Sequence, residues 1–351
     1  MKKQSRRRKV LRESIFTICT ALVLLGASLL TFAWFHHARP TKRESVGMRI
    51  STPTPYVPAP ETFTPEPETA SSSDVPSASL QPTATPAPTP LDLMAAYGSL
   101  FSSEKVKTDS GYQSSNVSIS IEKVQYGEGD SAVYYLADIY IGDVRCLKTM
   151  LAEDSFGKGI RESVKNMAAR GQGILAITGD TYGNQDAGIV IRNGVLHRQE
   201  LSDFDVCVLY QDGTMETYGP SQFSLEGAVT RGAWQAWSFG PMLLDKEGNP
   251  LPDAQLNTSK NIRRANPRVG LGYYAPGHYC FIVVDGRTDD ASGLTLEQFA
   301  QLFASLGCKA AYNLDGGRSS FMVYDGSVLN DPYKGGRSVS DCILITDIIE
   351  E

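Results

Sequence analysis

The chain has 351 residues, enough for a membrane segment, a linker and one folded domain of ordinary size. Its formal net charge is −6, and without a basic excess we expect no nucleic-acid partner. The six cysteines form no C-x-x-C pair and have no histidine at metal-ligand spacing, so the sequence argues against a zinc site. We interpret the cysteines as core thiols and leave one disulfide open.

The N-terminus has the pattern of a membrane anchor. Residues 1–13 form a basic end, and Ser14 to Phe35 follow without a charge. At about 1.5 Å per helical residue this apolar segment matches the thickness of a bilayer. A cleaved signal peptide is the alternative, but an A-x-A-like cleavage site is missing between Leu30 and Ala38. The sequence predicts a single-pass protein of the cell membrane with a cytoplasmic N-terminus and an extracytoplasmic C-terminal domain.

Residues 36–90 are dominated by Pro, Thr, Ser, Ala and Glu, and twelve of the nineteen prolines lie there. Such a composition buries too little apolar surface to fold, so we predict a disordered, extended stalk that is dispensable for the chemistry. Residues 91–351 are then the folded domain. We expect an α+β fold with mixed sheets and helices in this single extracytoplasmic domain.

The first half of the domain contains several clear element patterns. A short helix is expected within 91–103, and residues 117–124 and 132–141 alternate apolar and polar residues as strands do. Residues 162–170 have helical spacing, and the strand 174–177 follows and leads to Thr178, Gly179 and Asp180. Two hairpins are then expected, one turning at Asn193-Gly194 and the other at Asp212-Gly213.

The second half repeats this order. A strand at 279–284 ends in Asp285, and a helix at 296–306 has a capping box of Thr295 and Gln298. The next strand leads to Asp315. Helix, glycine, strand, Asp-bearing loop and hairpin therefore occur twice, with Asp180 matching Asp315. We hypothesise a duplication that brings both carboxylates to one cleft, although helix-glycine-strand units are also common in unrelated α+β proteins.

The stretch Ala310 to Met322 has the pattern of a strand, a tight polar loop and another strand. Gly316 and Gly317 let the backbone approach a ligand closely and direct N–H groups at an anion. Arg318 offers a planar fork suited to phosphate. An ordinary hairpin turn is the alternative for this segment.

Several motifs together resemble the phosphodiester glycosidase family, which is related to N-acetylglucosamine-1-phosphodiester alpha-N-acetylglucosaminidase. The resemblance runs from about Val117 to Thr346, and its most specific part is Asn-Leu-Asp-Gly-Gly at 313–317. The other segments that carry it are Ile177 to Asp180, Ile191 to Gly194, Val283 to Arg287 and Arg337 to Ser340. The chain departs from the family pattern at Thr178 and Arg318.

The resemblance implies hydrolysis of a sugar C1–O bond to a phosphodiester, with wall, capsular or other exopolysaccharide polymers as candidate substrates. An oxocarbenium-like transition state needs a carboxylate, and the anionic leaving group needs positive charge. The candidate catalytic residues are Asp315, Asp180 and Asp285, with acid and base unassigned. The candidate substrate and phosphate ligands are Arg192, Arg268, Arg287, Asn313, Gly316, Gly317, Arg318, Ser319 and Arg337.

We expect no cofactor, and a carboxylate-bound calcium stays open. The four histidines lack partners for a Ser-His-Asp hydrolase. Because of the departures at Thr178 and Arg318, one alternative is a non-catalytic glycan or wall-polymer binding protein that uses the same cleft. A stalked structural protein that docks partners is another.

Overall fold

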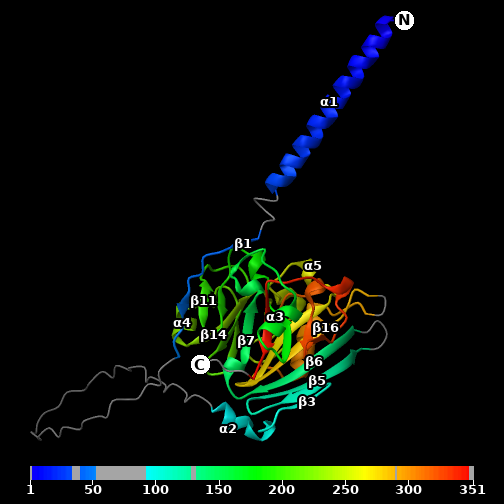
Figure 1. Ribbon diagram of the computed structural model, residues 1–351. Coiled ribbons are helices and arrows are strands. Elements are labelled where there is room, and N and C mark those ends of the chain that lie inside the picture. The colour runs from blue at the N-terminus through cyan, green and yellow to red at the C-terminus, as the bar shows by residue number, and fades with distance from the viewer. Residues whose placement is uncertain (1, 34–39, 53–91, 128–131, 289–290, 348–351) are drawn as a thin grey trace, which may run out of the picture.

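The computed structural model describes residues 2–33, 40–52, 92–127, 132–288 and 291–347. Over these ranges the chain forms a long N-terminal helix and an α+β domain of packed sheets with short helices (Figure 1). The α+β expectation is confirmed, and all the described strand pairs are antiparallel.

In the described residues one sheet has seven strands in the order β17-β15-β16-β6-β5-β4-β3. The predicted strand at 132–141 is confirmed with the same bounds, and its alternating residues face the core. The strands are β3 (Val106–Thr108), β4 (Gly111–Gln113), β5 (Val117–Tyr126), β6 (Ala132–Ile141), β15 (Arg268–Ala275), β16 (His278–Val284) and β17 (Ala310–Asn313).

A second sheet has, over the described ranges, five strands in the order β19-β18-β9-β20-β7. Its central strands β9 and β20 are buried at every residue, which explains their continuous apolar runs. The strands are β7 (Leu147–Leu151), β9 (Leu175–Thr178), β18 (Met322–Tyr324), β19 (Ser327–Val328) and β20 (Asp341–Ile345).

The third sheet has six strands within the described chain, in the order β13-β12-β14-β10-β11-β2. The predicted turn at Asn193-Gly194 is confirmed, since both residues have positive φ and join β10 to β11. The strands are β2 (Met48–Arg49), β10 (Val190–Arg192), β11 (Val195–Arg198), β12 (Val206–Tyr210), β13 (Met215–Tyr218) and β14 (Ala233–Ser238).

Short helices cover the sheets. The capping box of Thr295 and Gln298 is confirmed at the start of α6, whose phenylalanines pack on the seven-stranded sheet. A cluster of buried residues drawn from all three sheets forms the main core. The α-helices of the domain are α2 (Leu93–Tyr97), α3 (Val164–Arg170), α4 (Leu225–Thr230), α5 (Lys260–Arg263) and α6 (Leu296–Ser305).

Residues 40–52 belong to the folded domain, which corrects the predicted stalk at 36–90. Strand β1 (Thr41–Lys42) pairs with β8 (Gly157–Lys158), and β2 pairs with β11. Ile50 is only 7% exposed and joins the core of the six-stranded sheet. The sequence of this segment is polar, so it shows no strand pattern. Its order comes from backbone hydrogen bonds to the edges of neighbouring strands, and these bonds need no apolar alternation. The rest of the predicted stalk, from residue 53 on, lies outside the described residues.

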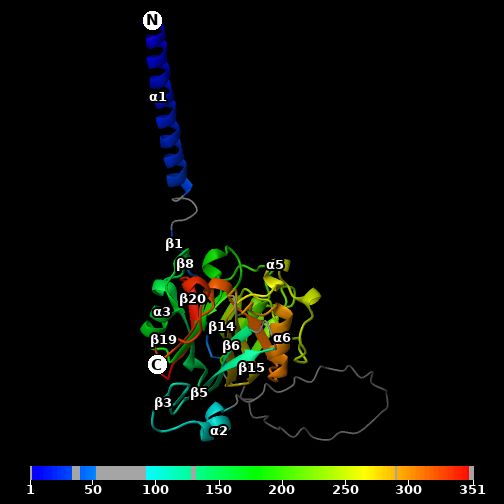
Figure 2. The same ribbon diagram turned by 90° about the vertical axis from the view of Figure 1, so that its right-hand side faces the viewer.

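The first helix, α1, runs from Lys2 to Ala33 and stands apart from the domain (Figures 1 and 2). Among the described residues, no helix has both the length and the apolar character needed to cross a membrane. The predicted anchor at Ser14 to Phe35, whose last two residues lie outside the described ranges, stays a prediction.

Candidate active site

The two predicted Asp-bearing loops meet at the junction of two sheets. Strand β9 ends at Thr178 and strand β17 ends at Asn313. Beyond these ends the backbone N–H of Asp315 donates a hydrogen bond to the carbonyl oxygen of Gly179 at 3.1 Å. The strands belong to different sheets, so this contact joins the five-stranded sheet to the seven-stranded one. Asp180 and Asp315 therefore lie close together, but the Asp180 side chain is fully buried and does not face the predicted shared cleft.

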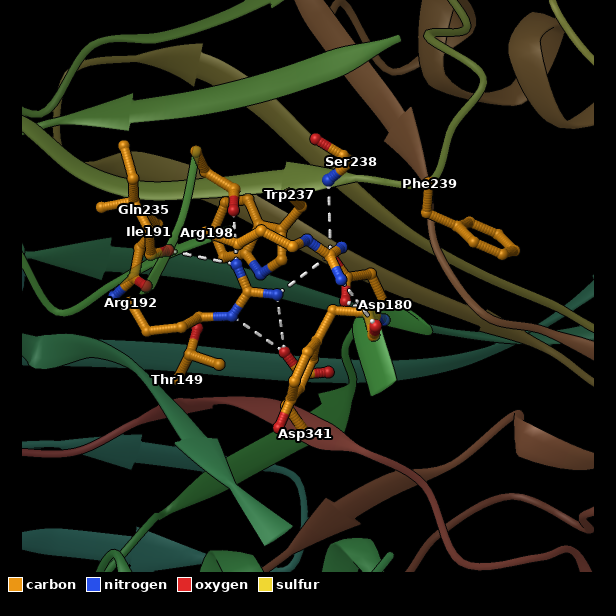
Figure 3. Close-up of polar contacts among 12 residues, drawn as sticks. Thr149, Asp180, Ile191, Arg192, Arg198, Gln235, Trp237, Ser238, Phe239 and Asp341 are labelled. Carbon is orange, nitrogen blue, oxygen red and sulfur yellow. Dashed lines mark hydrogen bonds and ion pairs between the residues drawn. The ribbon is translucent and has the colours of Figure 1, made fainter. Parts of the chain in front are cut away.

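Asp180 lies at the bottom of this junction in a fully buried ionic cluster. Its carboxylate forms an ion pair with Arg192 at 2.9 Å and accepts backbone N–H groups of Tyr182 at 2.8 Å and Ser238 at 3.3 Å. The guanidinium of Arg192 also contacts Asp341, with its Nε at 2.9 Å and its Nη2 at 2.8 Å from Oδ2 (Figure 3). Arg192 thus forms ion pairs with the two buried carboxylates of Asp180 and Asp341.

This arrangement changes the role predicted for Arg192. Its remaining donor, Nη1, points to the carbonyl oxygens of Ile191 and Ala236, and the residue is 2% exposed. The guanidinium is therefore occupied by protein groups and lies too deep for a phosphate ligand. We assign it to positioning Asp180. The sequence could not show this because the partner Asp341 is 149 residues away.

Asp341 is the residue of this cluster that sequence reasoning missed. It begins the apolar strand β20, and an acidic residue at that place in a buried strand was the available signal. Burial raises the pKa of Asp341, and the nearby Asp180 raises it further, while Arg192 opposes this shift. Its carboxyl lies against Gly179, where even a Cβ atom would clash. Gly179 is thus required by close packing.

Asp315 lies above this cluster and keeps an exposed edge. Its side chain is 11% exposed and pairs with Arg337, whose Nη2 is 3.1 Å from Oδ2. The side chain of Arg337 is 40% exposed, and its Nε donates to the hydroxyl of Ser319 at 2.6 Å. Burial raises the pKa of Asp315, against the opposing effects of Ser319 and Arg337. A partly desolvated carboxyl beside a partly exposed cation suits acid–base or electrostatic catalysis.

The glycine loop next to Asp315 packs closely against the protein, and the N–H of Gly317, predicted to bind an anion, is used in a protein hydrogen bond. Gly317 has a φ of 63° and its N–H donates to the carbonyl oxygen of Pro267 at 2.9 Å. A Cβ at Gly317 would lie 3.4 Å from the guanidinium of Arg287. Arg287 is in turn oriented by the side chain of Asn266. Arg287 therefore lies at the edge of the Gly316-Gly317 loop.

Two further predicted ligands border the loop. The guanidinium of Arg318 donates to the carbonyl oxygen of Gly336 at 2.9 Å and the residue is exposed. Asn313 is buried, and its Nδ2 donates to the carbonyl oxygen of Gly240 at 2.9 Å. Its Oδ1 finds no hydrogen-bond partner within the described ranges, which leaves an acceptor free beside the carboxylates. Thr178 donates to the carbonyl oxygen of Ser319 and so ties this loop to β9.

Two predicted site residues have structural partners instead. The guanidinium of Arg268 is 3% exposed and donates to the carbonyl oxygens of Leu294, Ile262 and Arg264. Asp285 accepts the side-chain amide of Asn330 at 2.9 Å and the N–H of Asp331. Burial raises the pKa of Asp285. Both residues stabilise loops around the site, and neither contacts the Asp180 or Asp315 carboxylates in the described contacts.

Two described cavities lie away from the candidate carboxylates. Their volumes are about 600 and 380 Å³, and they are lined by other residues, such as Tyr273 and His278. Among the described residues no group of three His, Cys, Asp or Glu side chains is placed to hold a metal ion. All six cysteines are free thiols, and five are buried. The sulfurs of Cys280 and Cys308 lie 3.7 Å apart.

Residues 168–346, which contain all the site residues described above, match the family model of phosphodiester glycosidases. The chain belongs to the phosphodiester glycosidase family. It is also similar to the SPbeta prophage-derived uncharacterized protein YomE of Bacillus subtilis (strain 168), with 32% identity over 198 residues. That match covers 54% of this chain and 30% of YomE, so the chain spans about a third of this relative's length.

A solved structure shares the fold of this phosphodiester glycosidase family member. The catalytic domain of zebrafish N-acetylglucosamine-1-phosphodiester alpha-N-acetylglucosaminidase, auto-inhibited by its pro-peptide, aligns with a TM-score of 0.53 and 21% identity. The alignment covers 66% of this chain and 83% of the zebrafish chain. At this level of identity the likeness concerns the fold alone.

Proposed function

We propose that this protein hydrolyses the bond between a sugar C1 and the oxygen of a phosphodiester. The observation that carries the proposal is the Asp315 carboxyl, which is held at the end of a packed strand with one edge exposed beside Arg337. Strand-end attachment gives the positional accuracy that catalysis requires. Family membership indicates the bond type, and the surrounding cations suit a phosphate.

The geometry suggests how the roles divide. Asp315 faces the substrate and stabilises positive charge at C1 or activates water. Asp180 stays behind it, paired with the guanidinium of Arg192. The phosphate lies toward Arg337, Arg318 and Arg287, which are exposed. A phosphate leaving group is a weak base, so it needs these cations more than it needs a strong general acid.

We further propose that α1 anchors the protein in the cell membrane, with the domain outside. The support is that α1 begins with a basic stretch, Lys2 to Arg12, and continues with exposed apolar side chains, a pattern that favours a cytoplasmic N-terminus. The exposed apolar residues of α1 are Ile15, Phe16, Ile18, Leu22, Val23, Leu24, Leu25, Leu29 and Leu30. A mature protein whose N-terminus is found near Ala38 would contradict this topology.

Turnover tests the proposed activity. The full chain in detergent is incubated with UDP-N-acetylglucosamine and with a simple sugar-1-phosphodiester, and the released sugar is measured. We expect release that depends on Asp315. Binding without release across a panel of sugar phosphodiesters would replace this proposal with a non-catalytic glycan-binding protein.

A further inference from the structure

The membrane-proximal end of the domain can be identified from its attachment to α1. Helix α1 ends at Ala33 and the first paired residue of the domain is Thr41. The intervening chain spans at most about 25 Å, since an extended residue adds about 3.5 Å. In both views β1 and α5 lie at the end of the domain nearest α1, whereas α2 and β3 lie at the opposite end (Figures 1 and 2).

The candidate active site lies at this same end. On one side, β1 pairs with β8, and the N–H of Gly159, the residue after β8, donates to the carbonyl oxygen of Gly183 at 3.0 Å. Gly183 belongs to the helical turn Tyr182–Asn184, which follows Asp180. On the other side, Gly317 of the site loop bonds to Pro267, four residues after α5. The attachment segment and α5 therefore flank the carboxylates.

The surface of α5 combines an exposed apolar side chain with exposed cations. Ile262 is 39% exposed, and Lys260 and Arg264 are exposed beside it. Leu201, 61% exposed, belongs to the loop that Asn257 ties down through a 2.8 Å hydrogen bond to the carbonyl oxygen of Asp203. An apolar side chain flanked by basic ones, as Ile262 is by Lys260 and Arg264, suits the interface of an anionic membrane, whereas exposed Glu200 and Asp203 flank Leu201.

Side chains from the domain hold the backbone of α5 in place through hydrogen bonds and an ion pair. Buried Arg268 donates to the carbonyl oxygens of Ile262 and Arg264, and Arg263 pairs with Asp253 at 3.3 Å. The donors of Arg268 thus satisfy the C-terminal carbonyls of α5, which otherwise lack partners. Arg268, which the sequence predicted to be a phosphate ligand, therefore stabilises the surface helix α5.

We propose that the end of the domain carrying β1, α5 and the Gly316-Gly317 loop rests on an anionic membrane surface, and that its substrates are glycosyl phosphodiesters held in that membrane by a lipid tail. This inference rests on the proposed hydrolase activity and on the proposed anchoring by α1. In the reaction, the hydroxyl group of a water molecule is added to C1 of the sugar. The bond between C1 and the bridging phosphate oxygen breaks. The products are the free sugar and a lipid phosphate monoester, which takes the proton.

The first test compares two substrates with the full chain reconstituted in phosphatidylglycerol–phosphatidylcholine vesicles. One substrate is an N-acetylglucosaminyl phosphodiester of a long-chain prenol in the same vesicles, and the other is UDP-N-acetylglucosamine in solution. We expect Lys260→Glu with Arg264→Glu to lower turnover of the lipid-linked substrate roughly tenfold or more, because each reversed charge weakens docking. Turnover of the soluble substrate should stay unchanged.

A control at the opposite end replaces two exposed lysines, Lys105→Gln with Lys107→Gln, which removes their ion pairs with Asp347 and Asp325 without adding like charges and should affect neither substrate. Equal losses on both substrates, or no loss on the lipid-linked one, would overturn the proposal. If wild type turns over neither substrate, the proposed hydrolase activity fails.

A second test measures docking of the domain on the membrane directly, without using substrate turnover. An environment-sensitive fluorophore is attached at Ile262→Cys or, as the control, at Val106→Cys, which is 45% exposed on β3. Both carry Cys19→Ser, because Cys19 is the exposed thiol of the described chain. A blue shift at position 262 alone, larger with more phosphatidylglycerol, supports docking. The same response at both positions would refute it.

Discussion

The N–H of Asp315 donates to the carbonyl oxygen of Gly179 at 3.1 Å, and this single hydrogen bond joins the ends of two strands from different sheets. It brings the exposed edge of Asp315 over the buried ion pair of Asp180 and Arg192. The candidate site therefore lies where two sheets meet. The partly exposed Asp315 and the buried pair of Asp180 and Arg192 should respond differently to substitution.

Asp315→Asn should lower turnover by at least about a hundredfold, the range of acid–base and electrostatic groups, while the fold stays intact. The change keeps the size of the side chain and removes its charge. Turnover of the folded fraction and the melting temperature are measured on the same sample. Near-wild-type turnover in a well-folded variant would remove Asp315 from the mechanism.

Arg192→Met should act on stability first. It leaves Asp180 and Asp341 buried without their cation, which costs about 3–5 kcal/mol of the free energy of unfolding in comparable pairs. Urea denaturation measures this. The control is Arg145→Met, whose pair with Asp143 is partly exposed, and it should cost about 1 kcal/mol at most. Equal effects of the two changes would contradict the buried cluster.

Asp341→Asn should flatten the pH dependence of stability. Burial raises the pKa of Asp341, so the folded state binds this proton more tightly than the unfolded state does. Its stabilising contribution is therefore complete below the ordinary pKa of about 3.9 and is lost as the pH rises through the raised value. Denaturation series across this range should show a steeper decline in wild type than in the variant. Parallel profiles would show that Asp341 titrates normally.

Ile50→Ala should destabilise the domain by about 2–4 kcal/mol, as for other buried Ile-to-Ala changes. Val46→Ala in the same segment is the control, because Val46 is 46% exposed, and should cost under about 0.5 kcal/mol. Removing residues 1–52 should cost more than removing residues 1–39, since only the longer deletion strips β1 and β2 from their partners. If both truncated chains melt alike, residues 40–52 contribute nothing to the fold.

Much of the domain could be predicted from local sequence. The strand at 132–141, the hairpin at Asn193-Gly194 and the capped helix α6 all depend on neighbouring residues, whose alternation, turn chemistry and capping are visible in the chain. The Asn-Leu-Asp-Gly-Gly segment likewise indicated the site and the family, because its glycines and carboxylate are adjacent in sequence.

Strands whose pattern depends on distant partners could not be predicted. Strand β15 contains Gly270 and Gly272, which read locally as breaks, but their missing side chains make room for Phe299 and Phe303 of α6. The packing of α6 against β15 explains both glycines. Segment 40–52 was likewise read as stalk, because its order comes from hydrogen bonds to β8 and β11.

Residue types and spacing determined which side chains could do chemistry, and the tertiary structure decided which of them can reach a substrate. Five arginines were equivalent in sequence, yet Arg192 and Arg268 are buried against protein acceptors while Arg287, Arg318 and Arg337 border the glycine loop. The difference is burial: protein acceptors enclose the guanidinium groups of Arg192 and Arg268, whereas Arg287, Arg318 and Arg337 are exposed and a ligand can reach them. That depends on contacts between residues far apart in the chain.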